Sequence, residues 1–280
     1  MGQALQDGYR EKVFIADKLF MTLVRKPEDF DKQLAKQLER LQTDCIDFYL
    51  FHGLNRNKLE KVRELKLLDK MVEAREKGLI KYIGFSFHDT LAMFKEIIDA
   101  FDWDMCQIIY NYMDMGMQAT TDGLKYAHEK GVGTVIMGPL KGGLLADPPE
   151  EAIEVMNKAN VKRTPVEWAL QFLWNLPEVS TTLSGMETQQ IIDENCAYAE
   201  KSGVNTLSKE DLSVIDELAE IYKKKILVPC TTCLYCVPCP YGVNIPDNFA
   251  LLNYFSHEKE GFRRWRVRRR YRKMLVSKAA

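Results

Sequence analysis

The sequence predicts an α/β protein in which short β-strands alternate with longer helices along most of the chain. Short apolar runs rich in Val, Ile, Phe and Tyr recur, and each is followed by polar or glycine residues and then by a stretch with helical spacing. Strands that always alternate with helices run parallel and are joined by right-handed crossovers. The sheet is therefore expected either to stay open as a doubly wound fold or to close into a barrel.

Six strands are predicted, and helices are expected between and after them. The predicted strands are residues 13–17, 46–51, 82–86, 106–110, 133–137 and 180–184. The predicted helices are residues 27–41, 59–77, 90–100, 120–130, 150–157, 165–174, 187–199 and 208–224. Pro165 suits the first turn of a helix, Ser208 with Asp211 resembles a capping box, and Gly78 and Gly131 fall just past helix ends.

The strand count and the absence of one motif distinguish between the two kinds of sheet. No G-x-G-x-x-G sequence follows the first predicted strand, which argues against a doubly wound dinucleotide-binding fold. A closed parallel barrel ordinarily has eight strands, so two strands are missed, absent or supplied by another chain. Near residue 226 the sequence changes to a cysteine cluster and a basic run. We therefore predict a partial barrel over residues 1–225 and a small cysteine-rich segment over 226–280.

Composition and charge limit the class of protein. The chain has 280 residues, 46% of them hydrophobic and 28% charged, so it is long enough to bury a large core. Lys and Arg number 39 against 40 Asp and Glu, which gives no overall preference for nucleic acid or an anionic membrane. No run approaches the roughly 18 apolar residues of a membrane helix, and the N-terminus does not resemble a secretory signal. We expect a cytoplasmic protein without a membrane partner.

Polar residues and glycines follow the predicted strands, where the chemistry of βα-barrels takes place. Lys18 follows the first strand, His52 the second, Ser86 the third and Asn111 the fourth, and a Gly-Pro-Leu-Lys-Gly-Gly segment follows the fifth. Taken singly, each has a structural explanation; Ser86, for instance, suits the cap of the next helix. A Lys and a His that converge on one rim could together polarise a carbonyl and tune a proton donor.

Several segments of the chain resemble a known family. The resemblance lies in VFIADKL, LQTDCIDFYLFHGL, IKYIGFSFH, CQIIYNYMD, GPLKGGLL and VSTTLSGM, which are similar in order and spacing to strand segments of the aldo/keto reductases. The most similar branch is bacterial and has a C-terminal iron–sulfur region. The resemblance implies a (β/α)8 TIM barrel that reduces small aldehydes and ketones by hydride transfer from NADP(H). In that family a Tyr donates the proton, assisted by Lys, His and Asp.

The resemblance assigns roles to individual positions. Lys18 matches the catalytic Lys, whose charge would lower the pKa of the Tyr, and His52 matches the catalytic His, which would orient the substrate carbonyl. The positions that match cofactor-binding residues are Ser86 and Gln107 for the nicotinamide amide, Tyr110 for ring stacking, Pro139 and Leu140 near the cofactor backbone, and Glu194 and Asn195 near the adenine end.

The chain also departs from the family pattern. In the family the catalytic Asp and Tyr belong to a D-T-A-x-x-Y-type segment at and after the second strand, and this sequence contains no such segment. Gly2–Leu5 resembles the end of the second barrel helix, so the first two strands are expected to be missing and the chain to be truncated at both ends. Asp17 stands where the family commonly has Thr. We expect these 280 residues alone to be an impaired reductase.

Four of the seven cysteines lie within ten residues: Cys230, Cys233, Cys236 and Cys239. The odd total and the crowding argue against a disulfide framework and favour metal. Thiolates three residues apart with Pro240 after the last are typical of iron–sulfur runs, although the final spacing is one residue shorter than usual. Zinc and a reactive thiol cluster are the alternatives.

The resembling reductases carry a second cysteine run, and this chain ends where that run would begin. The resemblance therefore implies three ligands of a [4Fe–4S] cluster from Cys230, Cys233 and Cys236, with Cys239 either completing the cluster or left unpaired. The basic run at 263–273 is interpreted as a solvated linker helix, so nucleic acid is not an expected partner. An alternative function is a non-catalytic iron–sulfur electron-transfer protein that uses the barrel as a scaffold, with a redox partner protein.

Overall fold

Six strands form one sheet and follow one another in chain order. They are β1 (Ala16–Leu19), β2 (Ile46–Leu54), β3 (Ile80–Phe87), β4 (Met105–Ile109), β5 (Gly133–Met137) and β6 (Thr181–Thr182). The pairs from β1 to β5 are all parallel. This order confirms the predicted parallel α/β architecture and is consistent with part of a (β/α)8 barrel. Lys18 and His52 lie inside strands, not after them as predicted, because β1 and β2 extend further along the chain.

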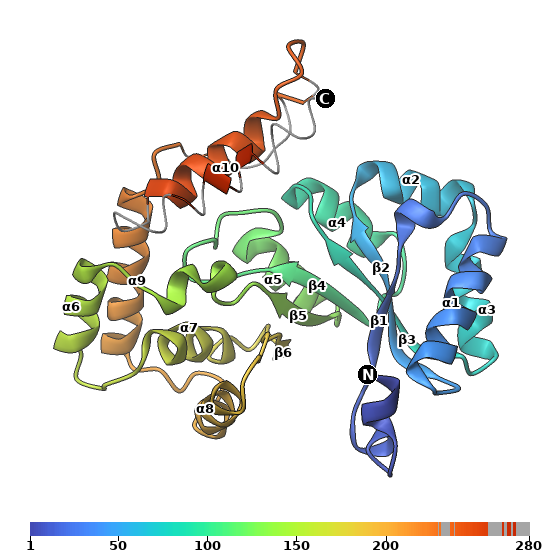
Figure 1. Ribbon diagram of the computed structural model, residues 1–280, viewed down its shortest axis with the longest axis horizontal. Coiled ribbons are helices and arrows are strands. Elements are labelled where there is room, and N and C mark those ends of the chain that lie inside the picture. Colours follow the sequence, from blue (N-terminus) through green and yellow to red (C-terminus); the bar gives the residue numbers. More distant parts are fainter. Residues whose placement is uncertain are drawn as a thin grey trace. The chain divides into compact units, whose positions relative to one another are not determined.

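The computed structural model describes residues 1–228, 230, 236, 237, 239–256, 265, 268, 269, 271 and 272 (Figure 1). The chain forms two units. The first consists of Met1–Ile109, Gln118–Met137 and Glu178–Thr181, and the second of Tyr110–Met117, Gly138–Pro177 and Thr182–Ala280. None of the helices in the described ranges is long and apolar enough to cross a membrane.

The first unit carries short 3-10 helices at Gly2–Leu5, Arg10–Lys12 and Met21–Leu23. Its α-helices are α1 (Glu28–Leu41), α2 (Arg56–Glu64), α3 (Leu67–Glu76), α4 (Leu91–Asp99) and α5 (Thr120–Glu129). The second unit contains a 3-10 segment at Lys141–Ala146 and α6 (Glu150–Lys158), α7 (Pro165–Trp174), α8 (Gln189–Glu200), α9 (Lys209–Lys224) and α10 (Ile245–Ser256). Two predicted helix signals are confirmed, since Pro165 begins α7 and Ser208 forms a capping box with Asp211.

The single helix predicted over 59–77 is wrong, because the chain breaks there into α2 and α3. Lys66 has a left-handed backbone with φ 49° and separates the two helices. In one continuous helix Lys66 would lie on the same face as Leu59 and Val62, both of which are buried. The break changes the phase of the helix, so that Leu67 is buried instead and Lys66 is exposed to solvent.

Aromatic side chains pack one face of the sheet against the helices of the first unit. Tyr49 of β2 meets Phe30 of α1 edge-on at 5.9 Å between ring centroids, and Phe85 of β3 lies 4.8 Å from Trp103. Strand residues alternate between the two faces, so Phe48 and Tyr82 point the other way and stack at 4.8 Å. Tyr82 is 41% exposed. Figure 1 shows α1 and α3 beside the strands β1 to β3.

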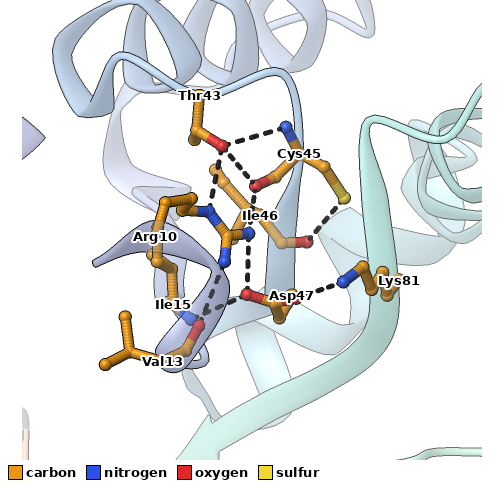
Figure 2. A network of polar contacts seen from close by, with 8 residues as sticks. All are labelled: Arg10, Val13, Ile15, Thr43, Cys45, Ile46, Asp47 and Lys81. Carbon is orange, nitrogen blue, oxygen red and sulfur yellow. Dashed lines mark hydrogen bonds and ion pairs between the residues drawn. The ribbon is translucent and has the colours of Figure 1, made fainter. Parts of the chain in front are cut away.

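A buried carboxylate fastens the segment before β1 to the start of β2 and β3. Asp47 is 1% exposed and accepts the backbone N–H of Ile15 at 2.9 Å. Arg10 lies 2.8 Å from the same carboxylate and Lys81 lies 2.6 Å from it (Figure 2). Arg10 also donates to the carbonyl oxygen of Cys45 at 2.9 Å. Burial raises the pKa of Asp47, but the contacts with Lys81, Ile15 and Arg10 outweigh it and hold the pKa below its usual value.

Replacing Asp47 with Asn is expected to lower the free energy of unfolding by about 3 kcal/mol at pH 7, because it leaves a partly buried Arg10 without its counter-charge. Since the folded-state pKa of Asp47 is lowered, its contribution is complete above the unfolded pKa and is lost as the pH falls through the folded pKa. The difference between the two proteins should therefore shrink below about pH 4. Urea unfolding followed by circular dichroism measures it, with exposed Asp44→Asn as the matched control. Equal urea midpoints for the two variants would contradict the role of Asp47.

Candidate active site

The parallel register of β1 to β4 gathers the predicted site residues of the first unit on one face of the sheet. Lys18 lies opposite Leu50, and Leu50 lies opposite Gly84. Ser86 comes two residues after Gly84, on the same face, and is the register partner of Gln107. Three predicted residues, Lys18, Ser86 and Gln107, therefore share the same face near the carboxyl ends of their strands.

A β-bulge in β2 determines how the backbone runs at His52. Phe51 pairs with Phe85 and Leu54 with Phe87, so β2 contains one residue more than β3 over this stretch. Gly53 adopts φ 63°, a conformation that glycine takes without strain. Its N–H donates to Ser86 Oγ at 2.7 Å. The bulge is thus tied to β3 by the side chain of Ser86.

Lys58 of α2 also forms hydrogen bonds with the bulge. Its ammonium donates to the carbonyl oxygen of His52 at 3.1 Å and to that of Gly53 at 2.8 Å. A Cβ atom at position 53 would lie 3.1 Å from Lys58 Nζ, which is a second reason for glycine there. Ser86 does not cap the next helix, as one alternative held, because Thr90 caps α4 by accepting the N–H of Met93.

The charges that shift the pKa of His52 are positive. Burial lowers the pKa of His52, and the charges of Lys18, Lys58 and His88 lower it further. Burial also lowers the pKa of Lys18, although Asp17 partly opposes this, and burial lowers the pKa of Lys58. His52 is therefore mainly neutral at pH 7, and the surrounding cations favour an anion or a polarised carbonyl oxygen.

The side chain of Gln107 has a buried acceptor for which the described residues supply no partner. Gln107 is buried, and its Oε1 atom makes no hydrogen bond within the described structure. A buried acceptor without a partner costs about 1–3 kcal/mol, so it calls for a partner such as a bound ligand or an ordered water. The neighbouring Ser86 is buried as well.

The remaining predicted cofactor residues belong to the second unit. Tyr110 is buried and its ring stacks on Phe172 at 6.1 Å with an interplanar angle of 15°. Pro139 is buried and Leu140 precedes the 3-10 segment that begins at Lys141. The others lie on α8: Glu194, which accepts from Gln190 at 2.8 Å, and Asn195, which donates to Ser184 Oγ at 3.0 Å.

The cysteine cluster is only partly covered by the structure. Cys230, Cys236 and Cys239 are half-buried free thiols, and Cys233 lies outside the described residues. Within the described part of the chain, no three His, Cys, Asp or Glu side chains form a group that could hold a metal ion. Of the basic run, only residues 265, 268, 269, 271 and 272 are described, and there the Arg269 guanidinium lies 5.4 Å from the Trp265 ring.

Lys58 was not among the site residues predicted from the sequence. It is the third residue of α2, and the side chain of Asn55 caps that helix by accepting the N–H of Lys58. The first turn of a helix favours acidic side chains, because the helix dipole is positive there. Because the predicted helix began at residue 59, Lys58 fell outside it and this signal was missed.

A comparison with family models decides the identity of the fold. The model described as "Aldo/keto reductase family" matches residues 1–220. The chain belongs to the aldo/keto reductase family. This confirms the family to which the strand segments were found similar.

Curated relatives match parts of this aldo/keto reductase chain. L-galactose dehydrogenase of Arabidopsis thaliana is 26% identical over 207 residues, covering 69% of this chain and 64% of that protein. An NADP(+)-named aldo-keto reductase of Schizosaccharomyces pombe is 28% identical over 151 residues, covering 50% of this chain and 43% of that protein. The chain thus spans less than two thirds of the length of each of these relatives.

Solved structures share the fold. A thermostable aldo-keto reductase in complex with the inhibitor epalrestat is 28% identical, with a TM-score of 0.64, covering 78% of this chain and 75% of that chain. An aldo-keto reductase from Klebsiella pneumoniae in complex with NADPH is 21% identical, with a TM-score of 0.63, covering 78% of this chain and 73% of that chain. At 21% identity the second likeness shows the fold alone.

Replacing Lys58 with Met should raise the pKa of His52, because the variant removes one of the cations that lower it. Titration of the histidine ring signals by NMR measures this, with His52→Gln to assign the signal. Lys61→Met is the matched control, since Lys61 lies on the same helix and donates to the carbonyl oxygen of Met21 at 3.0 Å. An unchanged pKa of His52 in Lys58→Met would show that the lysine charge does not act on the imidazole.

Proposed function

We propose that the chain binds NADP(H) and takes part in hydride transfer to a small carbonyl compound. The observation that supports this best is the pair formed by Ser86 and Gln107, two buried polar residues opposite each other on neighbouring strands. The nicotinamide carboxamide has a donor and an acceptor side by side. Gln107 Oε1, which makes no hydrogen bond within the described structure, would accept from the amide N–H, and the Ser86 hydroxyl would donate to the amide oxygen.

Lys18 and His52 are assigned to the substrate. When bound, NADP(H) supplies the hydride. The cationic surroundings of His52 favour negative charge that develops on a carbonyl oxygen, and the neutral imidazole can donate one hydrogen bond to it. Burial lowers the pKa of Lys18, and the neighbouring charge of Asp17 opposes that shift. The family resemblance also assigns cofactor contacts to residues that belong to the second unit: Tyr110, Pro139, Leu140, Glu194 and Asn195.

One relative supports the choice of nucleotide. The Schizosaccharomyces pombe relative is named with NADP(+). The 280 residues contain no D-T-A-x-x-Y segment, so the proposal assigns them no tyrosine proton donor. General acid catalysis is typically worth about 10²–10⁴-fold, and we therefore expect turnover by these residues alone to be impaired.

NADPH binding tests the cofactor site directly. Gln107→Leu keeps the size of the side chain and removes the amide, so we expect the Kd for NADPH to rise about tenfold or more. Quenching of tryptophan fluorescence during titration with NADPH measures the Kd. Gln171→Leu is the matched control, because this buried glutamine donates to the carbonyl oxygen of Tyr198 in the second unit. The proposal fails if NADPH does not bind saturably, or if Gln107→Leu binds it as tightly as the unaltered chain.

We further propose that the cysteine segment takes one [4Fe–4S] cluster, in a cytoplasmic protein that has a redox partner protein. The donor set fits this cofactor in its chemistry, because four thiolates are soft ligands that suit iron–sulfur centres. The described thiols are not gathered into a metal group, so the support comes from their spacing in the sequence.

Anaerobic reconstitution tests the cluster. We expect at most about four iron and four sulfide ions per chain, because one run of cysteines can hold one cluster. Cys230→Ser should lower both amounts, whereas Cys196→Ser, at an exposed thiol on α8, should not. Eight iron per chain, or uptake of zinc in place of iron, would contradict the assignment. A redox-active cluster in a chain that fails to bind NADPH would instead favour the electron-transfer alternative.

A further inference from the structure

An ion pair between a half-buried lysine and a buried carboxylate joins the segment after β4 to the loop after β5 in the second unit. Asp114 is 4% exposed, and both of its carboxylate oxygens contact the ammonium of Lys141, with Oδ2 at 2.6 Å. Asn111 donates through Nδ2 to Asp114 Oδ2 and to the carbonyl oxygen of Gly138, both at 3.1 Å. Asn111 Oδ1 accepts the N–H of Met113 and that of Asp114, each at 3.0 Å. The carboxylate is thus fixed from its own segment before it reaches Lys141.

The loop that receives this ion pair has an unusual backbone. Lys141, Gly142 and Gly143 all have positive φ, at 47°, 66° and 95°. Glycine takes these values freely, but a left-handed lysine costs roughly 1–2 kcal/mol. The N–H of Lys141 donates to Gly138 at 3.0 Å, which closes a tight turn around Pro139 and Leu140. An ion pair to a buried carboxylate is the interaction that offsets the strain of a lysine at this position.

We propose that Asp114 is a positioning residue for nucleotide binding: it holds Lys141 and thereby fixes the 138–143 loop that presents Pro139 and Leu140. This inference rests on the proposed function, which assigns those two residues to the cofactor. Asp114 neutralises the charge of Lys141, so the pair acts on the shape of the loop and not by attracting the phosphates.

The direction in which Asp114→Asn changes the Kd for NADPH separates these two roles. If Lys141 attracted phosphate by its charge, Asp114→Asn would release that charge and tighten NADPH binding. If the pair positions the loop, the same substitution frees the loop and weakens binding. The full 280-residue chain is titrated with NADPH, and we expect Asp114→Asn and Lys141→Met each to raise the Kd about tenfold. Because the two residues act as one unit, the double variant should be no worse than either single variant.

A second ion pair of the same unit provides the control for a general loss of stability. Arg163 pairs with Asp211 through two contacts, at 2.6 and 3.2 Å, and the pair is mostly buried. Asp211→Asn should lower the unfolding temperature and leave the Kd for NADPH within about twofold.

Three results would overturn the inference. The first is a Kd for Asp114→Asn that is unchanged or lower than that of the unaltered chain, the lower value indicating a phosphate-attracting Lys141. The second is an equal rise of the Kd in Asp211→Asn, which would assign the effect to stability alone. The third is an unaltered chain that does not bind NADPH, which overturns the proposed function and this inference with it, whereas the first two results leave the proposed function standing.

Discussion

Hydrogen bonding between parallel neighbours aligns the carboxyl ends of β1 to β4 at one edge of the sheet, and the site of the first unit depends on that alignment. Because register partners point to the same face, the side chains of Ser86 and Gln107 lie on that face as neighbours. Lys18 of β1 lies on the same face for the same reason. The helices cover the other face, so the aromatic core and the polar site use alternate residues of the same strands.

One irregularity in this regular sheet lies at the candidate site. The extra residue in β2 turns the chain at His52 and Gly53, and it is stabilised by polar side chains from two other elements, Ser86 of β3 and Lys58 of α2. Ser86 therefore has a structural task in addition to its proposed one. The same lysine that holds the bulge also lowers the pKa of His52, so the geometry and the electrostatics of the site share one interaction.

Buried carboxylates at three places show how the fold uses ion pairs. Asp47 fastens the first segment of the chain to the sheet, Asp211 combines a helix cap with an ion pair to Arg163, and Asp114 holds a strained loop. In each case the carboxylate has at least two partners, which is what a buried charge needs to offset its lost hydration. Removing one partner is costly for that reason, and the structural effect is local to the segment that each carboxylate holds.

The local pattern of the sequence predicted much of this fold. The alternation of apolar runs and helical stretches predicted all six strands and the parallel sheet, and β5 and α7 have the predicted bounds, because apolar periodicity and Pro or Gly signals act within a few residues. Only the tertiary structure decided the break at Lys66, the bulge at Gly53 and the entry of Lys58 into the site. These depend on contacts between segments that are distant in sequence, such as the hydrogen bond of Gly53 with Ser86. A local sequence pattern does not record the free energies of such contacts.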